Sequence, residues 1–308
     1  MNNKAFPVWQ VAVLLLAAVL IIPALVVSVQ QPLAPLQLSM LRESGMAMAA
    51  LAVLCFMVSS LTGNHSQVDK LWSIVPMAYV WYFAWMNNME DRSVLMAVMV
   101  TIWGFRLTYN FARRGGYSWK FWTGEEDYRW SLLRKSPAFN ATWRWVLFNL
   151  LFISLYQMTL IWLFCLPAVA VAGMDTKLTM VDWLLATAMF LAILLETIAD
   201  QQQWNFQRKK LSQANTVETA KGFLDTGLWS YVRHPNYTAE QSVWILFYGF
   251  SIVATEQWIN WSVIGCILLL MLFQGSARFS EGISAGKYPD YHQYMQQTSR
   301  FIPLRIKR

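Results

Sequence analysis

The sequence predicts an all-α polytopic membrane protein with about eight transmembrane helices. Of its 308 residues, 56% are hydrophobic and 13% are charged, whereas soluble domains carry about 25% charged residues. Apolar runs recur with almost no charge inside them. Each is long enough, or nearly so, to cross a hydrocarbon layer about 30 Å thick. The composition therefore excludes a soluble domain, a disulfide scaffold and a nucleic-acid-binding module.

The predicted spans follow the apolar runs in chain order. The first run is longer than the core of a secretory signal peptide, so we expect it to be a true span. The fifth is long enough to tilt strongly or to include a re-entrant piece. The predicted spans are 8–29, 45–62, 71–87, 93–110, 144–172, 180–198, 242–255 and 259–275.

The basic residues predict the orientation of these spans. Twenty of the 24 Lys and Arg residues, counting Arg144 at a span boundary, lie in the termini and loops of one side. The other side has Arg42, Arg92 and Lys177, and Arg106 lies inside a span. Because cytoplasmic loops carry the basic excess, we expect both termini in the cytoplasm and the chain in a bacterial inner membrane. Membrane lipids are the expected partners of this positive charge, and nucleic acid is not needed to explain it.

No Gly-, Ser- or Pro-rich linker divides the chain, so we expect one integral membrane domain over residues 1–308. Nearly all residues capable of chemistry lie in the segments 111–143, 199–241 and 276–308, which the orientation places in the cytoplasm. The site is therefore expected to face the cytoplasm. The oligomeric state is not determined by the sequence.

An Arg-His-Pro segment before the seventh span is the densest polar signal. Pro235 suits the first turn of a helix, which would place Arg233 and His234 at a helix N-terminus that favours a phosphate. Asn236 and Glu240 are four residues apart and share a helix face, where they offer a donor and an acceptor for a carboxamide or a ribose. An ordinary interfacial anchor of basic and aromatic residues is the alternative.

A polar stripe runs along the end of the sixth span. Glu196, Asp200, Gln203 and Gln207 recur at helical spacing. Glu196 lies near the membrane boundary, where an ionisable group usually faces a cavity. The stripe predicts one wall of a polar pocket shared with the Arg-His-Pro segment. A solvated helix end is the alternative.

The fourth span carries a cation inside the membrane. Arg106 needs an anion there, and Arg106, Asn110 and Arg113 lie along one helix face, which suits a bound phosphate. A pair between Arg106 and an intramembrane carboxylate is the alternative.

Asp69 opens the third span. A carboxyl group that enters a membrane cavity tends to have a raised pKa, which suits acid catalysis. A capping role at the helix start is the alternative. His65, His234 and His292 are dispersed without the spacing of metal ligands, so we expect no metal site.

At these residues the chain resembles the steroid 5-alpha-reductase family, in particular its bacterial membrane members. The resemblance covers about residues 60–308, and the segment 1–44 looks like an added N-terminal span and connection before a seven-helix core. Isoprenylcysteine-type membrane methyltransferases share the Arg-His-Pro segment. The matching residues are Ala199-Asp200-x-Gln202, Gly227 with Arg233-His234-Pro235-Asn236-Tyr237-x-x-Glu240, Tyr288-Pro289-x-Tyr291-x-x-Tyr294 and Phe301-Ile302-Pro303.

This resemblance implies NADPH held by the cytoplasmic loops and hydride transfer to the β-carbon of a lipophilic enone. Tyr231, Asp200, Asn236 and Glu240 match cofactor-contacting positions. Asp69 lies near the family's catalytic acid. The family's carbonyl-binding tyrosine falls at Trp103, whose indole donates a hydrogen bond but supplies no proton at neutral pH.

We therefore predict a membrane-embedded NADPH-dependent reductase that acts on the C=C bond of a lipophilic enone. The alternatives are a methyltransferase that uses S-adenosylmethionine and a non-enzymatic lipid-binding membrane protein. A cofactor with several phosphate charges should attract cations from separate segments. Those expected to converge on it are Arg106, Arg113, Arg233 and Arg278.

Overall fold

A computed structural model describes residues 32–120, 122–174, 177–212 and 217–303. Within these ranges the chain is helical and forms no strand, and an isolated parallel bridge joins Val232 to Ser299. The prediction of an all-α protein is confirmed. The predicted first span, 8–29, lies outside the described residues.

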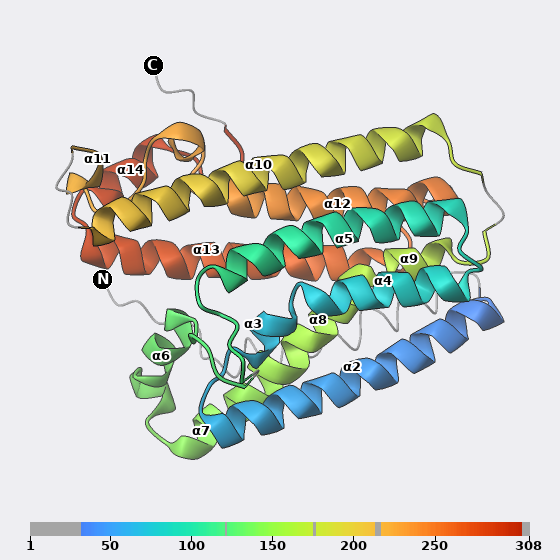
Figure 1. The fold of residues 1–308 in the computed structure, drawn as a ribbon, viewed down its shortest axis with the longest axis horizontal. Coiled ribbons are helices and arrows are strands. Elements are labelled where there is room, and N and C mark those ends of the chain that lie inside the picture. Colours follow the sequence, from blue (N-terminus) through green and yellow to red (C-terminus); the bar gives the residue numbers. More distant parts are fainter. Residues whose placement is uncertain (1–31, 121, 175–176, 213–216, 304–308) are drawn as a thin grey trace. The chain divides into compact units, whose positions relative to one another are not determined.

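Figure 1 shows the helices in chain order. They are α2 (Pro35–Thr62), α3 (Gln67–Leu71), α4 (Ile74–Met86), α5 (Asp91–Ala112), α6 (Tyr128–Arg134), the 3-10 turn η1 (Pro137–Phe139), α7 (Thr142–Phe148), the π-helical η2 (Asn149–Tyr156), α8 (Gln157–Cys165), α9 (Pro167–Val171), α10 (Met180–Leu211), α11 (Val217–Ala220), the 3-10 turn η3 (Gly227–Ser230), α12 (Pro235–Thr255), α13 (Val263–Lys287) and α14 (Tyr291–Gln297).

Five helical stretches of the described chain are long and apolar enough to cross a membrane. They are α2, α5, the stretch Thr142–Val171, α10 and α13, and α4 is a shorter apolar helix. Each predicted span from residue 45 onward overlaps a helix of the described chain. The span 144–172 is divided among α7, η2, α8 and α9, and the span 242–255 is the second part of α12, which begins with polar residues. The protein is therefore an all-α polytopic membrane protein.

The chain divides into two compact units. Unit 1 contains Met1–Asp182 and Tyr248–Cys266, and unit 2 contains Trp183–Phe247 and Ile267–Arg308. The prediction of one integral domain stays a prediction.

The stretch Thr142–Val171 forms the centre of unit 1, and 72% of the residues in its most apolar 18-residue part are buried. α2 runs antiparallel to it, since Gln37 donates to the carbonyl of Ala170 while Ser59 bonds to Asn149 at the other end. Pro167 follows a turn at Leu166 and starts a new helix, because its ring cannot continue the preceding one. The expected long span is thus a segmented buried helix.

α4 and α5 form a helical hairpin in the same unit. Its tight turn holds Asn88 and Met89 at positive φ. Ser73 bonds to Thr108 at the open end, and Trp81 bonds to Thr101 nearer the turn. This register places the start of α4, just after α3, beside the last turns of α5.

In unit 2, α10 and α12 run antiparallel (Figure 1), and the C-terminal segment folds back on the start of α12. Phe223, Tyr291 and Tyr294 form a buried aromatic cluster under that segment. The hydroxyl of Tyr294 donates to the carbonyl of Trp229. The C-terminal residues are therefore an integral part of this unit.

Candidate functional site

The predicted site residues fall into two groups. Asp69, Trp103, Arg106, Asn110 and Arg113 belong to unit 1. The remaining ones belong to unit 2 and are Glu196, Asp200, Gln203, Gln207, Tyr231, Arg233, His234, Asn236, Tyr237, Glu240 and Arg278.

Asp69 lies in the first turn of α3, a five-residue helix between α2 and α4. The N-cap of that helix is Ser66, not Asp69. The side chain of Asp69 is partly buried, and its Oδ2 accepts a hydrogen bond of 3.1 Å from the indole N–H of Trp130. Burial raises the pKa of Asp69, and the nearby negative charge of Asp127 adds to this effect. The structure therefore gives Asp69 an environment that favours a protonated carboxyl group.

The segment after α5 wraps around α3. Lys70 Nζ donates to the carbonyl of Thr123 at 2.7 Å, and Gln67 donates to the carbonyl of Trp122 at 3.0 Å. The hydroxyl of Tyr117 donates to the carbonyl of Lys70 at 2.8 Å. These bonds join residues about 50 positions apart in the sequence. They hold the short helix that carries Asp69 at a defined place.

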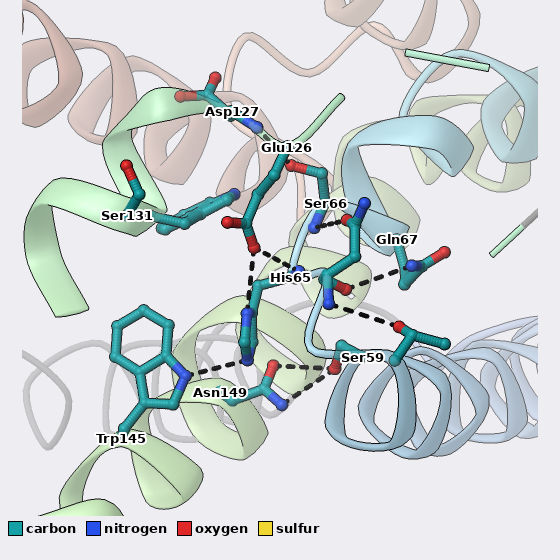
Figure 2. Close-up of polar contacts among 12 residues, drawn as sticks. Ser59, His65, Ser66, Gln67, Glu126, Asp127, Ser131, Trp145 and Asn149 are labelled. Atoms are coloured by element: carbon teal, nitrogen blue, oxygen red, sulfur yellow. Dashed lines mark hydrogen bonds and ion pairs between the residues drawn. The ribbon is translucent and has the colours of Figure 1, made fainter. Parts of the chain in front are cut away.

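His65 is the buried hub of this region, as Figure 2 shows. The indole N–H of Trp145 lies 2.9 Å from its Nε2, and Glu126 Oε1 lies 3.1 Å from its Nδ1. An indole nitrogen only donates, so Nε2 must be the unprotonated acceptor and Nδ1 must carry the hydrogen. Burial lowers the pKa of His65, and Arg134 acts in the same direction, while the bond to Glu126 opposes them. A proton on Nε2 would point at the N–H group of Trp145, and two donors cannot form a hydrogen bond. The fold therefore favours neutral His65.

We expect the unfolding free energy to fall as the pH decreases below about 6.5, the ordinary pKa of histidine. The folded-state pKa of His65 is depressed, so the unfolded chain binds more protons between the two values. The contribution of neutral His65 to the unfolding free energy is complete above the ordinary pKa and is lost as the pH falls through the pKa of the folded state. The slope is at most about 1.4 kcal/mol per pH unit. Unfolding in detergent across pH 4–8 measures this. His65→Gln should flatten the slope, whereas His292→Gln at an exposed site should retain it. An equal slope in both variants would assign the effect to other groups.

Trp103 is fully buried in α5, and no exposed edge of its indole reaches solvent. Further along the same helix, Arg113 Nε donates to Asn110 Oδ1 at 2.9 Å, so two of the three residues predicted to bind phosphate contact each other. Arg106 is partly buried. Their role in phosphate binding stays a prediction.

In unit 2, Asp200 on α10 and Asn236 on α12 are joined by a hydrogen bond. Asn236 Nδ2 donates to Asp200 Oδ1 at 3.2 Å. This bond orients the amide, because the reverse orientation would set two oxygens against each other. Asn236 Oδ1 and Gln203 Oε1 are then buried acceptors with no hydrogen-bond partner in the described part of the chain. Such groups are costly unless a donor reaches them, so these two oxygens offer acceptors to water or to any other hydrogen-bond donor that enters.

Two carboxyl groups lie one helical turn away from this pair. Glu196 and Glu240 are buried, and each is four residues from a member of the Asp200–Asn236 pair. Because the two helices are antiparallel, both glutamates lie at the same level on the facing sides of α10 and α12. Glu240 Oε1 accepts a hydrogen bond of 3.1 Å from Trp244. The predicted stripe therefore forms a polar wall over Glu196, Asp200 and Gln203, but it ends before Gln207, which is exposed.

The Arg-His-Pro segment requires a correction. The backbone amides of Arg233 and His234 are not available for a phosphate, because Arg233 N–H donates to the carbonyl of Ser299 and His234 N–H to the carbonyl of Arg300. The buried guanidinium of Arg233 donates through Nε to Glu281 at 2.8 Å and through Nη1 to the carbonyls of Met295 and Thr298. The segment anchors the C-terminus instead of forming the predicted anion site.

Glu281 was missed by the sequence-based prediction. It accepts hydrogen bonds from Arg233, from His234 Nε2 at 3.1 Å and from Arg300 Nη2 at 2.6 Å. Glu281 lies beyond the predicted span 259–275, in a segment expected to face the cytoplasm, so no pattern in the sequence singled it out. Its partners Arg233 and His234 are more than 40 residues away in the sequence.

Three further predicted residues have different surroundings. Tyr237 stacks on His234 with ring centroids 5.2 Å apart, whereas Tyr231 and Arg278 are exposed. Near Tyr231 in the sequence, the backbone N–H of Leu228 donates to Gln202 Oε1 on α10 at 3.0 Å. This hydrogen bond ties the Gly227 turn to the helix. Gly227 has a φ of 62°, a conformation that favours glycine.

In the described ranges, no group of three or more His, Cys, Asp or Glu side chains is arranged to hold a metal ion. The three cysteines are buried and form no disulfide.

Comparison with known proteins supplies the family. Residues 55–298 match the family described as "Protein of unknown function (DUF1295)". The chain is 36% identical over 263 residues to "Uncharacterized protein C594.04c" of Schizosaccharomyces pombe, covering 80% of this chain and 74% of that protein. No solved structure matches. The matched range includes α3 and the facing polar residues of α10 and α12, and the chain therefore belongs to the DUF1295 family.

Proposed function

We propose that this protein is a membrane-embedded reductase that uses NADPH to reduce the C=C bond of a lipophilic enone, steroid-like or another lipid. The DUF1295 family is related to steroid 5-alpha-reductase-like proteins, which agrees with the motif resemblance. The observation that carries the proposal is the acceptor wall of unit 2. It consists of the bonded pair Asp200–Asn236 and the buried, unpartnered oxygens of Asn236 and Gln203.

This wall fits the donor-bearing parts of the cofactor. NADPH, when bound, supplies a hydride for the β-carbon of the enone. Asn236 and Gln203 would accept hydrogen bonds from a carboxamide or a ribose hydroxyl, while Asp200 keeps the Asn236 amide oriented. Arg233 no longer belongs to the proposed phosphate contacts, because it is buried and its Nε and Nη1 donors are used within the protein. Arg278, which is exposed on α13, remains the proposed phosphate contact within unit 2, and the role of Arg106 and Arg113 of unit 1 stays a prediction.

Asp69 is the proposed acid. Its environment favours the protonated form, and a donor aimed at the carbonyl oxygen stabilises the negative charge that develops there. Trp103 is the proposed second donor, through its indole N–H.

Ligand-dependent stability tests the cofactor. NADPH should raise the thermal midpoint of the purified protein in detergent, because a ligand that binds only the folded state stabilises it. Asn236→Ala should weaken NADPH binding by roughly 0.5–1.5 kcal/mol, the usual range for a neutral hydrogen bond. Asn205→Ala is the matched control, since Asn205 is an exposed asparagine of α10 in the same unit and accepts a hydrogen bond from Gln201. Equal affinities in the two variants would remove Asn236 from the site.

A methyltransferase is the second candidate, favoured by the same acceptor wall. The α-ammonium group of S-adenosylmethionine is also a hydrogen-bond donor, and Glu196 and Glu240 add buried carboxyl groups beside the wall. Stabilisation by S-adenosylmethionine without any response to NADPH would reverse the ranking. A response to neither, with stabilisation by lipid alone, would favour a non-enzymatic lipid-binding protein.

The proposed orientation places both termini in the cytoplasm. It is supported by the distribution of Lys and Arg, which follows the positive-inside rule. Reporter fusions at the two ends should both be active in the cytoplasm. A C-terminal fusion that reports from the opposite side would overturn the assignment of the loops. The kind of membrane stays a prediction, and the relative described above comes from a yeast.

A further inference from the structure

We infer that Asp127, Arg129 and Trp130, on the segment that enters α6, are positioning residues that set the protonation of Asp69. The inference rests on the proposed function only for the use made of the proton. The effect of these residues on the protonation of the Asp69 carboxyl group is argued from contacts within unit 1 alone.

Trp130 fixes the side of the carboxyl group on which a proton resides. Its indole N–H donates to Asp69 Oδ2 at 3.1 Å, and Trp130 is buried. An indole nitrogen cannot accept a hydrogen bond. Because a carbonyl oxygen is a better acceptor than a hydroxyl oxygen, the bond makes Oδ2 the carbonyl oxygen of the protonated acid. The acidic proton is therefore directed to Oδ1.

Ser66 couples Asp69 to the backbone of the same segment. The hydroxyl oxygen of Ser66 accepts from the backbone N–H of Asp127 at 2.9 Å. Its own proton is then left to face the carboxyl group of Asp69, and the Ser66 side chain lowers the pKa of Asp69. Figure 2 shows Ser66 beside Asp127. A movement of residue 127 would therefore change the position of the Ser66 hydroxyl group beside Asp69.

The Asp127–Arg129 ion pair brings two opposite charges to Asp69. Arg129 contacts both carboxylate oxygens of Asp127, at 2.9 and 2.7 Å, and the Asp127 side chain also caps α6 by accepting from the Arg129 backbone N–H. The charge of Asp127 raises the pKa of Asp69, and that of Arg129 lowers it. With both present their effects on Asp69 oppose each other, so removing one partner leaves the other unbalanced.

Other groups near Asp69 act from α2 and α3. The Cys55 thiol on α2 is buried and interacts electrostatically with Asp69. The ammonium group of Lys70 also interacts with it, but its hydrogen bonds go to Gln67 and Thr123. Neither group lies on the segment that we propose to change. Variants on α6 and its cap therefore isolate the contribution of that segment.

The experiment measures the proton directly. The C=O stretch of protonated Asp69 is followed by infrared spectroscopy against pH in protein labelled with ¹³C-aspartate, and is assigned by its loss in Asp69→Asn. Asp127→Asn should shift the apparent pKa of Asp69 downward, and Asn preserves the helix cap. Arg129→Gln and Trp130→Phe should each shift it upward. Trp143→Phe, Arg144→Gln and Glu125→Gln, at exposed positions, are the matched controls and should leave it unchanged.

Opposite signs for the two partners of the ion pair would support the inference, because simple loosening of the fold shifts Asp69 in one direction only. Shifts of the same sign in all three variants, or none beyond those of the controls, would overturn it. If Asp127→Asn fails to fold, unchanged values in both Arg129→Gln and Trp130→Phe are decisive by themselves. The readout requires no substrate. A protein that shows these shifts but does not respond to NADPH would retain this inference and lose the proposed reductase function.

Discussion

Asp69→Asn is expected to lower turnover of an enone substrate by about 10²-fold or more, the range for loss of a general acid. NADPH binding should remain nearly unchanged, since Asp69 is not among the acceptor residues of unit 2. The reason is chemical: hydride addition places negative charge on the carbonyl oxygen, and a carboxyl group kept protonated by its surroundings can donate to it. Burial raises the pKa of Asp69 in the direction that this role requires. Trp103 supplies no proton at neutral pH, so Asp69 should carry more of the catalytic effect.

Steady-state turnover and NADPH affinity, measured on the same preparation, separate the outcomes. Glu125→Gln removes an exposed acidic side chain from the segment after α5 that wraps around α3. This variant should behave like the wild type. If Asp69→Asn keeps full turnover, then Asp69 only helps to hold α3 to α6 through Trp130. If both turnover and affinity collapse, the substitution has disturbed the fold.

Glu281→Gln is expected to lower the unfolding free energy by roughly 3–5 kcal/mol, the range for breaking a buried ion pair. The side chains of Arg233 and Glu281 are 9% and 5% exposed. Removal of the negative charge leaves the guanidinium of Arg233 buried without its counter-ion. Arg300 also loses its partner, so the C-terminal segment should separate more readily from the start of α12.

Denaturant unfolding in detergent measures the loss of stability, and hydrogen exchange locates it. The backbone N–H groups of Arg233 and His234, which donate to Ser299 and Arg300, should exchange faster. Asp225→Asn is the matched control. It breaks the Lys221–Asp225 pair, in which the lysine side chain is 51% exposed, and pairs of that kind contribute about 0–1 kcal/mol. Equal effects in the two variants would show that Glu281 does not hold the C-terminus.

The apolar parts of the long helices could be predicted from the sequence, but the partners of polar groups only in part. The stripe of Glu196, Asp200 and Gln203 follows from helical periodicity, and the structure places all three on the polar wall. The same periodicity extended the stripe to Gln207, which is exposed. Spacing along a helix gives the angular position of a side chain. It does not show where the neighbouring element ends.

The Arg-His-Pro segment shows why the interpretation of a local motif was wrong. A helix N-terminus with free amides does favour an anion. Here, however, the carbonyls of Ser299 and Arg300, more than 60 residues away, take the amides of Arg233 and His234. Glu281 takes the Arg233 side chain. A local sequence cannot indicate a competitor for its donors that arrives from the far end of the chain.

The all-α membrane class and the course of the predicted spans from residue 45 onward were determined by the sequence alone. Apolar length and the absence of charge are local properties, and the bilayer requires backbone hydrogen bonds to be satisfied within each helix. The tertiary structure decided which polar groups are paired and which buried oxygens have no partner within the described part of the chain. His65 is neutral because Trp145 meets it from 80 positions away, and Asn236 has a free oxygen because Asp200 holds its amide nitrogen. A buried polar group takes its properties from the groups that replace water around it, and the folded chain alone determines which groups those are.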